Sequence, residues 1–161
     1  MGLLKNLDPL LTADLLYILR LAGHGDEILI CDCNFPAYEV AQKTTTGKLV
    51  TLAGADAPEA CAAICSLLPL DYFVDQPVAQ MSPQEGVSLP AEGAAVHAAF
   101  ASALQKAGHV DISIESIPRF GFYERARQTF AVVQAAKERR PYGNFILKKG
   151  VIGPDGKDLR P

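Results

Sequence analysis

Residues 20–38, RLAGHGDEILICDCNFPAY, decide the fold expected for this chain. A helical stripe of apolar residues over 12–22 ends at Gly23, and EILICDC at 27–33 is an apolar run typical of a buried strand. A helix that leads through a short glycine-containing turn into a buried strand is typical of mixed α/β domains. The same stretch places His24 before the strand and Asp32 near its end.

The rest of the chain alternates between helix-like and strand-like segments. Pro77 interrupts one expected strand and predicts an edge position or a bulge there. No segment repeats at a fixed period, so we expect one mixed α/β domain over 1–151 and a loose polar tail over 152–161. Further helices are expected from Asp56 to Leu68, from Pro90 to Ala107 and over 121–129, and further strands over 48–54, 72–80, 111–117, 129–136 and 144–151.

Composition narrows the classes of function. A net charge of −3 gives no electrostatic reason to expect nucleic acid or an anionic membrane as a partner. No apolar run is long enough to span a bilayer, and the first residues do not form a signal peptide, so we expect a cytoplasmic protein. The four cysteines lack the spacing of a metal site and are expected to be small buried residues in a reducing compartment.

Several common catalytic motifs are missing from the sequence. It contains no GxxxxGK[ST], GxGxxG, HExxH or GxSxG pattern. An enzyme with this sequence must therefore use ordinary acids and bases, and we expect neither a metal nor a cofactor.

His24 is the first candidate for such chemistry, because imidazole changes its protonation near neutral pH. Asp32 is separated from it by a full strand, which is roughly 25 Å if the strand is straight. The two side chains therefore cannot meet within one subunit unless the strand bends, although a homo-oligomer could bring them together. The alternative is purely structural: His24 caps the preceding helix, and Asp32 begins the turn before Pro36.

Two later segments supply further candidates. In IPRFGFYERAR, at 117–127, Arg119 stands at a strand end with fixed donors suited to hydroxyls or carboxylates. Tyr142, Gly143 and Asn144 form a tight turn that presents a phenol and an amide together, which suits a polyhydroxylated ligand. The structural alternative for the turn is a hairpin with a packed tyrosine. Other polar residues have simpler expected roles: Glu124 and Arg127 on a solvated or ion-paired helix face, Lys148 and Lys149 as edge-strand charges, and His97 and His109 as structural or surface residues.

Three blocks of sequence, taken in order, resemble the family of L-fucose mutarotase and ribose pyranase. They are GHGDEI at 23–28 with Asp32 and FPA at 35–37, RFGFYERA at 119–126, and YGN at 142–144 with LKKG at 147–150. The likeness extends from residue 7 to 151. Ribose-type members tend to have a histidine in place of Arg119, YAN in place of YGN, and no FYERA block, so the chain resembles the fucose type. It departs from the family in its long 80–92 loop and in the tail.

The resemblance implies a mixed α/β subunit in a ring-like oligomer, commonly a decamer, with sites at subunit contacts. It implies that His24 is the proton donor and that Asp32, Arg119, Tyr142, Gly143 and Asn144 contact a free monosaccharide, most simply L-fucose. The expected reaction opens and recloses the sugar ring and so exchanges the α and β anomers, with Tyr142 as partner of His24 at the anomeric hydroxyl. Two alternatives remain open: a ribose pyranase, and a non-catalytic sugar-binding or transport-accessory module. A purely structural oligomer would bind no sugar.

Overall fold

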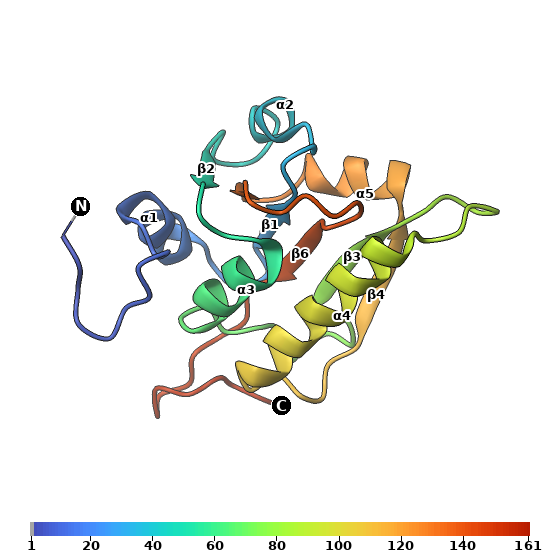
Figure 1. Ribbon diagram of the computed structural model, residues 1–161. Coiled ribbons are helices and arrows are strands. Elements are labelled where there is room, and N and C mark those ends of the chain that lie inside the picture. Colours follow the sequence, from blue (N-terminus) through green and yellow to red (C-terminus); the bar gives the residue numbers. More distant parts are fainter. Residues whose placement is uncertain (1) are drawn as a thin grey trace.

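The structure, a computed structural model, describes residues 2–161 and contains one six-stranded mixed sheet between two layers of helices (Figure 1). The strands lie in the order β2-β5-β1-β6-β3-β4, and β6 alone runs antiparallel to its neighbours. The elements in chain order are α1 (Ala13–Leu21), β1 (Glu27–Cys31), α2 (Ala37–Ala41), β2 (Leu49–Leu52), α3 (Ala57–Cys65), β3 (Val78–Ser82), α4 (Ala91–Lys106), β4 (Ile114–Pro118), α5 (Arg119–Ala126), β5 (Ala131–Ala135) and β6 (Phe145–Lys148).

The helix ends follow from local side-chain chemistry. The Thr12 side chain accepts a hydrogen bond from the Leu15 amide and caps α1. At α3, Asp56 and Glu59 form a reciprocal capping box, as the sequence predicts. Gly108, with φ of 95°, follows α4 in the left-handed conformation that glycine adopts readily.

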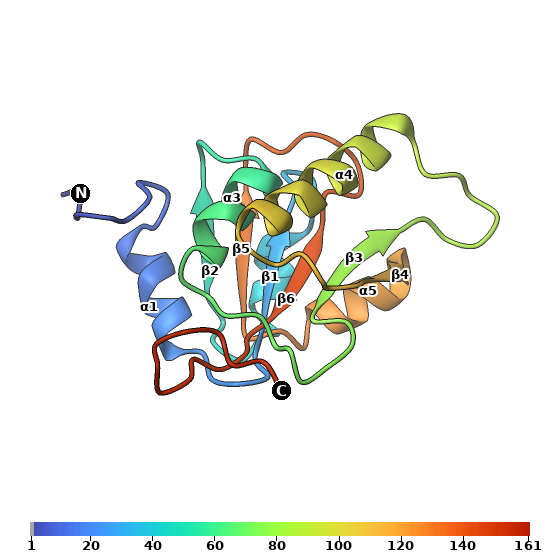
Figure 2. The same cartoon turned by 90° about the horizontal axis from the view of Figure 1, so that it is seen from below.

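The core lies on both faces of the sheet. Helices α1, α3 and α4 cover one face, and α2 and α5 cover the other (Figures 1 and 2). The alternation along β1 serves both layers: Ile28 and Ile30 pack toward the first, Leu29 and Cys31 toward the second. A strand buried on both faces must read as continuously apolar, which is what EILIC shows.

The predicted mixed α/β fold is confirmed, and the differences from prediction are local. The short helix α2 was not predicted, because its five residues follow Pro36 without a side-chain cap and are too few to show a helical period. The prediction for Pro77 was also wrong: it lies just before β3, which is an interior strand with no bulge at that position.

The prediction that Lys148 and Lys149 are edge-strand charges was wrong as well, because β6 lies between β1 and β3 in the middle of the sheet. Lys148 is 3.6 Å from the Glu27 carboxylate. The Lys149 ammonium donates to the Leu19 and Ala22 carbonyls at the end of α1, and burial lowers its pKa. Lys149 therefore fixes the C-terminus of α1, where backbone carbonyls lack helical partners.

The tail after residue 151 folds back onto the domain, whereas a loose segment was expected. Ile152 pairs with Asp158, and Arg160 donates to the Tyr72 hydroxyl and to the Gly108 carbonyl at 3.0 and 3.2 Å. By contrast, the segment between β3 and α4 projects away from the domain (Figure 2). No helix within residues 2–161 combines the length and the apolar character needed to cross a membrane.

Candidate active site

A cavity of about 260 Å³ lies at the edge of the sheet where all strands except the antiparallel β6 have their carboxyl ends. We call this the carboxyl edge of the sheet. In open α/β sheets this edge is where ligands usually bind. The cavity is also below the range typical of drug-sized ligands, so it fits a small molecule. Its lining comes from the segments after β1 and β4, the end of β3, and the turn before β6: Asp32, Asn34, Phe35, Met81, Arg119, Tyr123, Pro141, Tyr142 and Asn144.

Asp32 and Asn144 form a buried hydrogen-bonded pair in the wall of this cavity. The Asn144 amide donates to Asp32 Oδ2 at 2.9 Å, and the Asp32 backbone amide donates to Asn144 Oδ1 at 2.9 Å. Asp32 Oδ1 accepts two more hydrogen bonds, from the backbone amides of Asn34 and Phe35. Asn144 thus orients Asp32, and the carboxylate is held by directed donors.

Burial raises the pKa of Asp32, and the donors of Asn34, Asn144 and Phe35 oppose this only in part. The group has no cationic partner among its hydrogen bonds. An ionised carboxylate that is buried without a cation destabilises the fold. Such a group is a candidate for function, because packing alone does not explain it.

Tyr142 and Gly143 shape the turn next to Asn144. Tyr142 has φ of 62°, in the left-handed region, and is one of the residues that line the cavity. A Cβ atom on Gly143 would lie 2.9 Å from Glu138 Cγ, so close approach excludes a side chain there. The turn predicted at 142–144 is therefore built from a strained tyrosine and an obligatory glycine.

Arg119 and the aromatic residues form the opposite wall. Arg119 begins α5, directly after β4, as the strand-end placement predicts. Its Nε donates to the Tyr123 hydroxyl at 3.3 Å, and the Tyr123 ring packs against Phe35 with centroids 5.3 Å apart. Arg119 is exposed, so its remaining guanidinium donors are free to bind a hydroxyl or carboxylate ligand.

His24 lies at the opposite edge of the sheet and does not line this cavity. Its Nε2 is 3.1 Å from Asp71 Oδ1, and its ring contacts the Phe73 ring at 5.6 Å between centroids. The His24 side chain is 48% exposed whereas Asp71 is 4% exposed, so a buried carboxylate holds an accessible imidazole. The structure thus brings Asp32, Arg119, Tyr142 and Asn144 together and leaves His24 apart, at the far end of β1.

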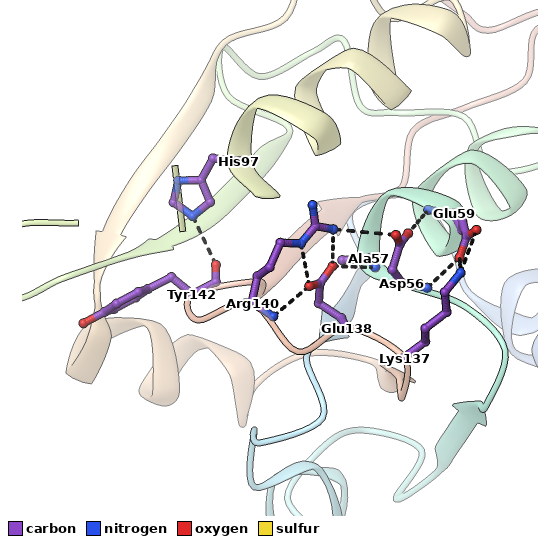
Figure 3. A network of polar contacts seen from close by, with 8 residues as sticks. All are labelled: Asp56, Ala57, Glu59, His97, Lys137, Glu138, Arg140 and Tyr142. Carbon is purple, nitrogen blue, oxygen red and sulfur yellow. Dashed lines mark hydrogen bonds and ion pairs between the residues drawn. The ribbon is translucent and has the colours of Figure 1, made fainter. Parts of the chain in front are cut away.

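A network of polar contacts holds the segment that leads into the turn at 142–144 (Figure 3). The buried Glu138 carboxylate accepts hydrogen bonds from Arg140 Nε and Nη2 at 2.8 and 2.6 Å and from the Ala57 amide at 3.2 Å. The Glu138 carbonyl also accepts from the Cys33 amide at 3.0 Å. Glu138 therefore links three segments at the carboxyl edge: the start of α3, the segment after β1, and the segment that leads to Tyr142.

Replacing Glu138 with glutamine should destabilise the fold by about 3 kcal/mol at neutral pH. All of its partners are donors, so the new amide group would face a donor. Burial raises the Glu138 pKa, but the Arg140 and Ala57 donors outweigh this and leave it below its usual value. The contribution is present above the unfolded-state pKa of about 4.3 and is lost as pH falls through the folded-state pKa.

Urea unfolding of both proteins at neutral and acidic pH measures this difference, which should shrink in acid. Glu59→Gln is the matched control: Glu59 is an exposed carboxylate that pairs with Lys137, and its loss should be below about 1 kcal/mol. Equal losses in the two variants would contradict the assigned role of Glu138.

Sequence reasoning missed Asp71 and Glu138. Asp71 is far from His24 in sequence, and only the strand order reveals that both lie at one edge. For Glu138 a signal existed: it closely follows an expected strand, and it lies at the same edge as Asp32 because that strand, β5, is parallel to β1.

Fold and cavity together define a single-domain α/β protein with a small cavity, lined by both polar and apolar residues, at the carboxyl edge of its sheet. Residues 5–152 match the RbsD / FucU transport protein family. The chain therefore belongs to this family, and the resemblance seen in the sequence motifs is confirmed.

Named relatives agree with this membership. Human fucose mutarotase (Homo sapiens) is 41% identical over 155 residues, which cover 92% of this chain and 94% of that protein. The crystal structure of the fucose mutarotase from Streptococcus pneumoniae in complex with L-fucose matches with a TM-score of 0.80 at 32% identity, covering 93% of this chain and 100% of that one. Bacillus subtilis RbsD complexed with D-ribose shares the fold, with a TM-score of 0.69 at 19% identity and coverage of 94% and 100%.

Proposed function

We propose that this protein is a cofactor-independent isomerase, a mutarotase that exchanges the α and β anomers of free L-fucose. The observation that carries the proposal is the cavity at the carboxyl edge, where an oriented carboxylate, a guanidinium and a phenol converge on a space of about 260 Å³. Relatives called fucose mutarotase match most of the chain and support the choice of sugar.

The chemistry needs only an acid and a base. Exchange of anomers deprotonates the anomeric hydroxyl and protonates the ring oxygen, so that the ring opens and recloses on its other face. In this proposal His24 protonates the ring oxygen, and the Tyr142 phenol acts at the anomeric hydroxyl. Asp32 and Arg119 hold sugar hydroxyls by charge-assisted hydrogen bonds, while Gly143 and Asn144 shape the turn beside them. Each well-placed acid or base contributes about 10²–10⁴-fold.

His24 can take part only if a second copy supplies it, because it lies at the opposite edge of its own sheet. We therefore include in the proposal a ring-like homo-oligomer, a decamer as the family resemblance implies, with each site at a subunit contact. The exposed imidazole and the exposed Phe73 beside it, 51% accessible, support an interface at this edge. A cytoplasmic location is also part of the proposal, supported by four free cysteines.

Two other functions are distinguishable. A ribose pyranase would exchange pyranose and furanose forms with the same residues, but the arginine at position 119 and the YGN turn favour the fucose type. A non-catalytic accessory module would bind sugar without accelerating exchange, and the transport function in the family description makes this a real alternative.

Saturation-difference proton NMR on the anomeric signals of L-fucose at equilibrium, with D-ribose run alongside, tests the proposal. Protein-dependent transfer between the α- and β-pyranose signals of fucose is the expected result. Transfer mainly between ribopyranose and ribofuranose would move the assignment to ribose pyranase. Binding of either sugar without transfer would identify an accessory module.

A further inference from the structure

The backbone of Tyr142 is held in an unfavourable conformation. Its φ of 62° lies in the left-handed region, and within residues 2–161 Asn6 is the other non-glycine residue with positive φ. A non-glycine residue keeps such a conformation only when its surroundings hold it there. Since Tyr142 lines the cavity, whatever holds its backbone also constrains where its phenol lies relative to the cavity.

Helix α4 contacts the two consecutive carbonyl groups of this turn. A Cβ atom on Gly93 would be 3.2 Å from the Pro141 carbonyl oxygen, so the turn approaches the helix closely. One turn later in α4, His97 Nε2 lies 3.1 Å from the Tyr142 carbonyl oxygen. Figure 3 shows the His97 ring above this carbonyl, with the Tyr142 phenol extending away from it. The carbonyl accepts only, so Nε2 carries the proton when this hydrogen bond forms.

The position of the His97 ring is itself fixed. It packs edge-on against Phe145, with centroids 5.7 Å apart and an interplanar angle of 71°. Phe145 in turn stacks on Phe100, with centroids 3.6 Å apart. Burial lowers the pKa of His97, and hydrogen bonds to the backbone of Tyr142 and Met81 oppose this. The donor is therefore a packed side chain rather than a surface group, and it is directed at one acceptor of the strained residue.

We propose that His97 is a positioning residue for the cavity: its hydrogen bond to the Tyr142 carbonyl holds the left-handed backbone and thereby aims the phenol at the bound sugar. That His97 holds the Tyr142 backbone is argued from the geometry alone, whereas the effect on anomer exchange rests on the proposed mutarotase function. His97 touches neither the cavity nor Asp32, so its effect on the reaction passes through Tyr142.

Two variants separate the hydrogen bond from packing. His97→Leu removes the donor and keeps an apolar contact with Phe145, whereas His97→Gln retains a terminal N–H near the position of Nε2. A residue with φ near +60° gives a strong intraresidue NOE between its amide and α protons, because these protons are close together. This NOE of Tyr142 should weaken in His97→Leu and persist in His97→Gln. With L-fucose, kcat/KM for anomer exchange should fall about tenfold in His97→Leu, and His97→Gln should restore most of it.

Gln105→Leu, on the exposed side of the same helix, is the control and should change neither readout. All variants are compared at a temperature where circular dichroism shows them folded. An unchanged Tyr142 NOE in His97→Leu would overturn the proposal, as would a weakened NOE with unchanged kcat/KM. If the wild-type protein does not accelerate exchange at all, the mutarotase function fails, and the NOE comparison still decides whether His97 holds the turn.

Discussion

Replacing His24 with alanine is expected to lower kcat for anomer exchange by about 10²–10⁴-fold while L-fucose still binds. The side chain is half-exposed and its one polar contact within residues 2–161 is to Asp71, so its removal should leave the fold intact. The sugar contacts proposed for Asp32 and Arg119 lie at the other edge of the sheet and are not disturbed. Saturation-difference NMR gives the exchange rate, and calorimetric titration with L-fucose gives the affinity.

Asp71→Asn refines the same test. The asparagine keeps an oxygen for the Phe73 amide but removes the charge that faces His24. A carboxylate hydrogen-bonded to an imidazole fixes the orientation of the ring, so this variant should lie between wild type and His24→Ala in kcat. A His24→Ala protein that exchanges anomers at the wild-type rate would remove His24 from the mechanism.

The proposal that each site lies at a contact between two subunits can be tested in mixed oligomers. If His24 of one copy serves the Asp32 cavity of another, two inactive variants, one altered at each residue, should regain part of the activity when assembled together. Mixtures prepared without dissociating the pure oligomers are the control and should stay inactive. If activity does not return in co-assembled oligomers, His24 of one copy and Asp32 of another do not form one site.

The sequence predicted most of the fold because its local signals agree with one another. Thr12 caps α1, Asp56 and Glu59 cap α3, and EILIC is apolar throughout because β1 is covered on both faces. It could not predict where β6 lies, since an antiparallel strand inserted between two others leaves no local mark. The wrong interpretation of Lys148 and Lys149 followed directly from that gap.

The candidate site was predictable where a residue ends a strand, and not where function depends on a distant partner. Asp32 and Arg119 could be placed at strand ends and residues 142–144 at a turn, because they border expected strands. That all of them meet at one edge depends on the antiparallel direction of β6, which only the structure reveals. The partner of His24, Asp71, and the donor to Tyr142, His97, belong to other elements and have no sequence motif. Asn144 was expected to contact the sugar, yet its amide is engaged with Asp32 on both sides.

Asp32→Asn should weaken L-fucose binding at least tenfold and should also disturb the fold. The new amide group would face the Asn144 amide, so two donors would meet. Rotating Asn144 would relieve this only by breaking the hydrogen bond from the residue 32 backbone amide. Leaving a buried polar group unpaired costs about 1–3 kcal/mol, although removing a buried charge offsets part of that loss.

A second substitution separates the two effects. In Asp32→Asn with Asn144→Asp, the amide at 32 donates to the carboxylate at 144, and the backbone amide of 32 still has its acceptor, so the pairing is restored with its polarity reversed. Urea unfolding should show recovered stability, whereas calorimetric titration with L-fucose should not show recovered affinity, because the carboxylate no longer stands at position 32. If affinity returns together with stability, Asp32 serves the fold rather than the sugar. If affinity stays lost in a stable protein, the buried carboxylate is retained for binding at the expense of stability, in line with its raised pKa.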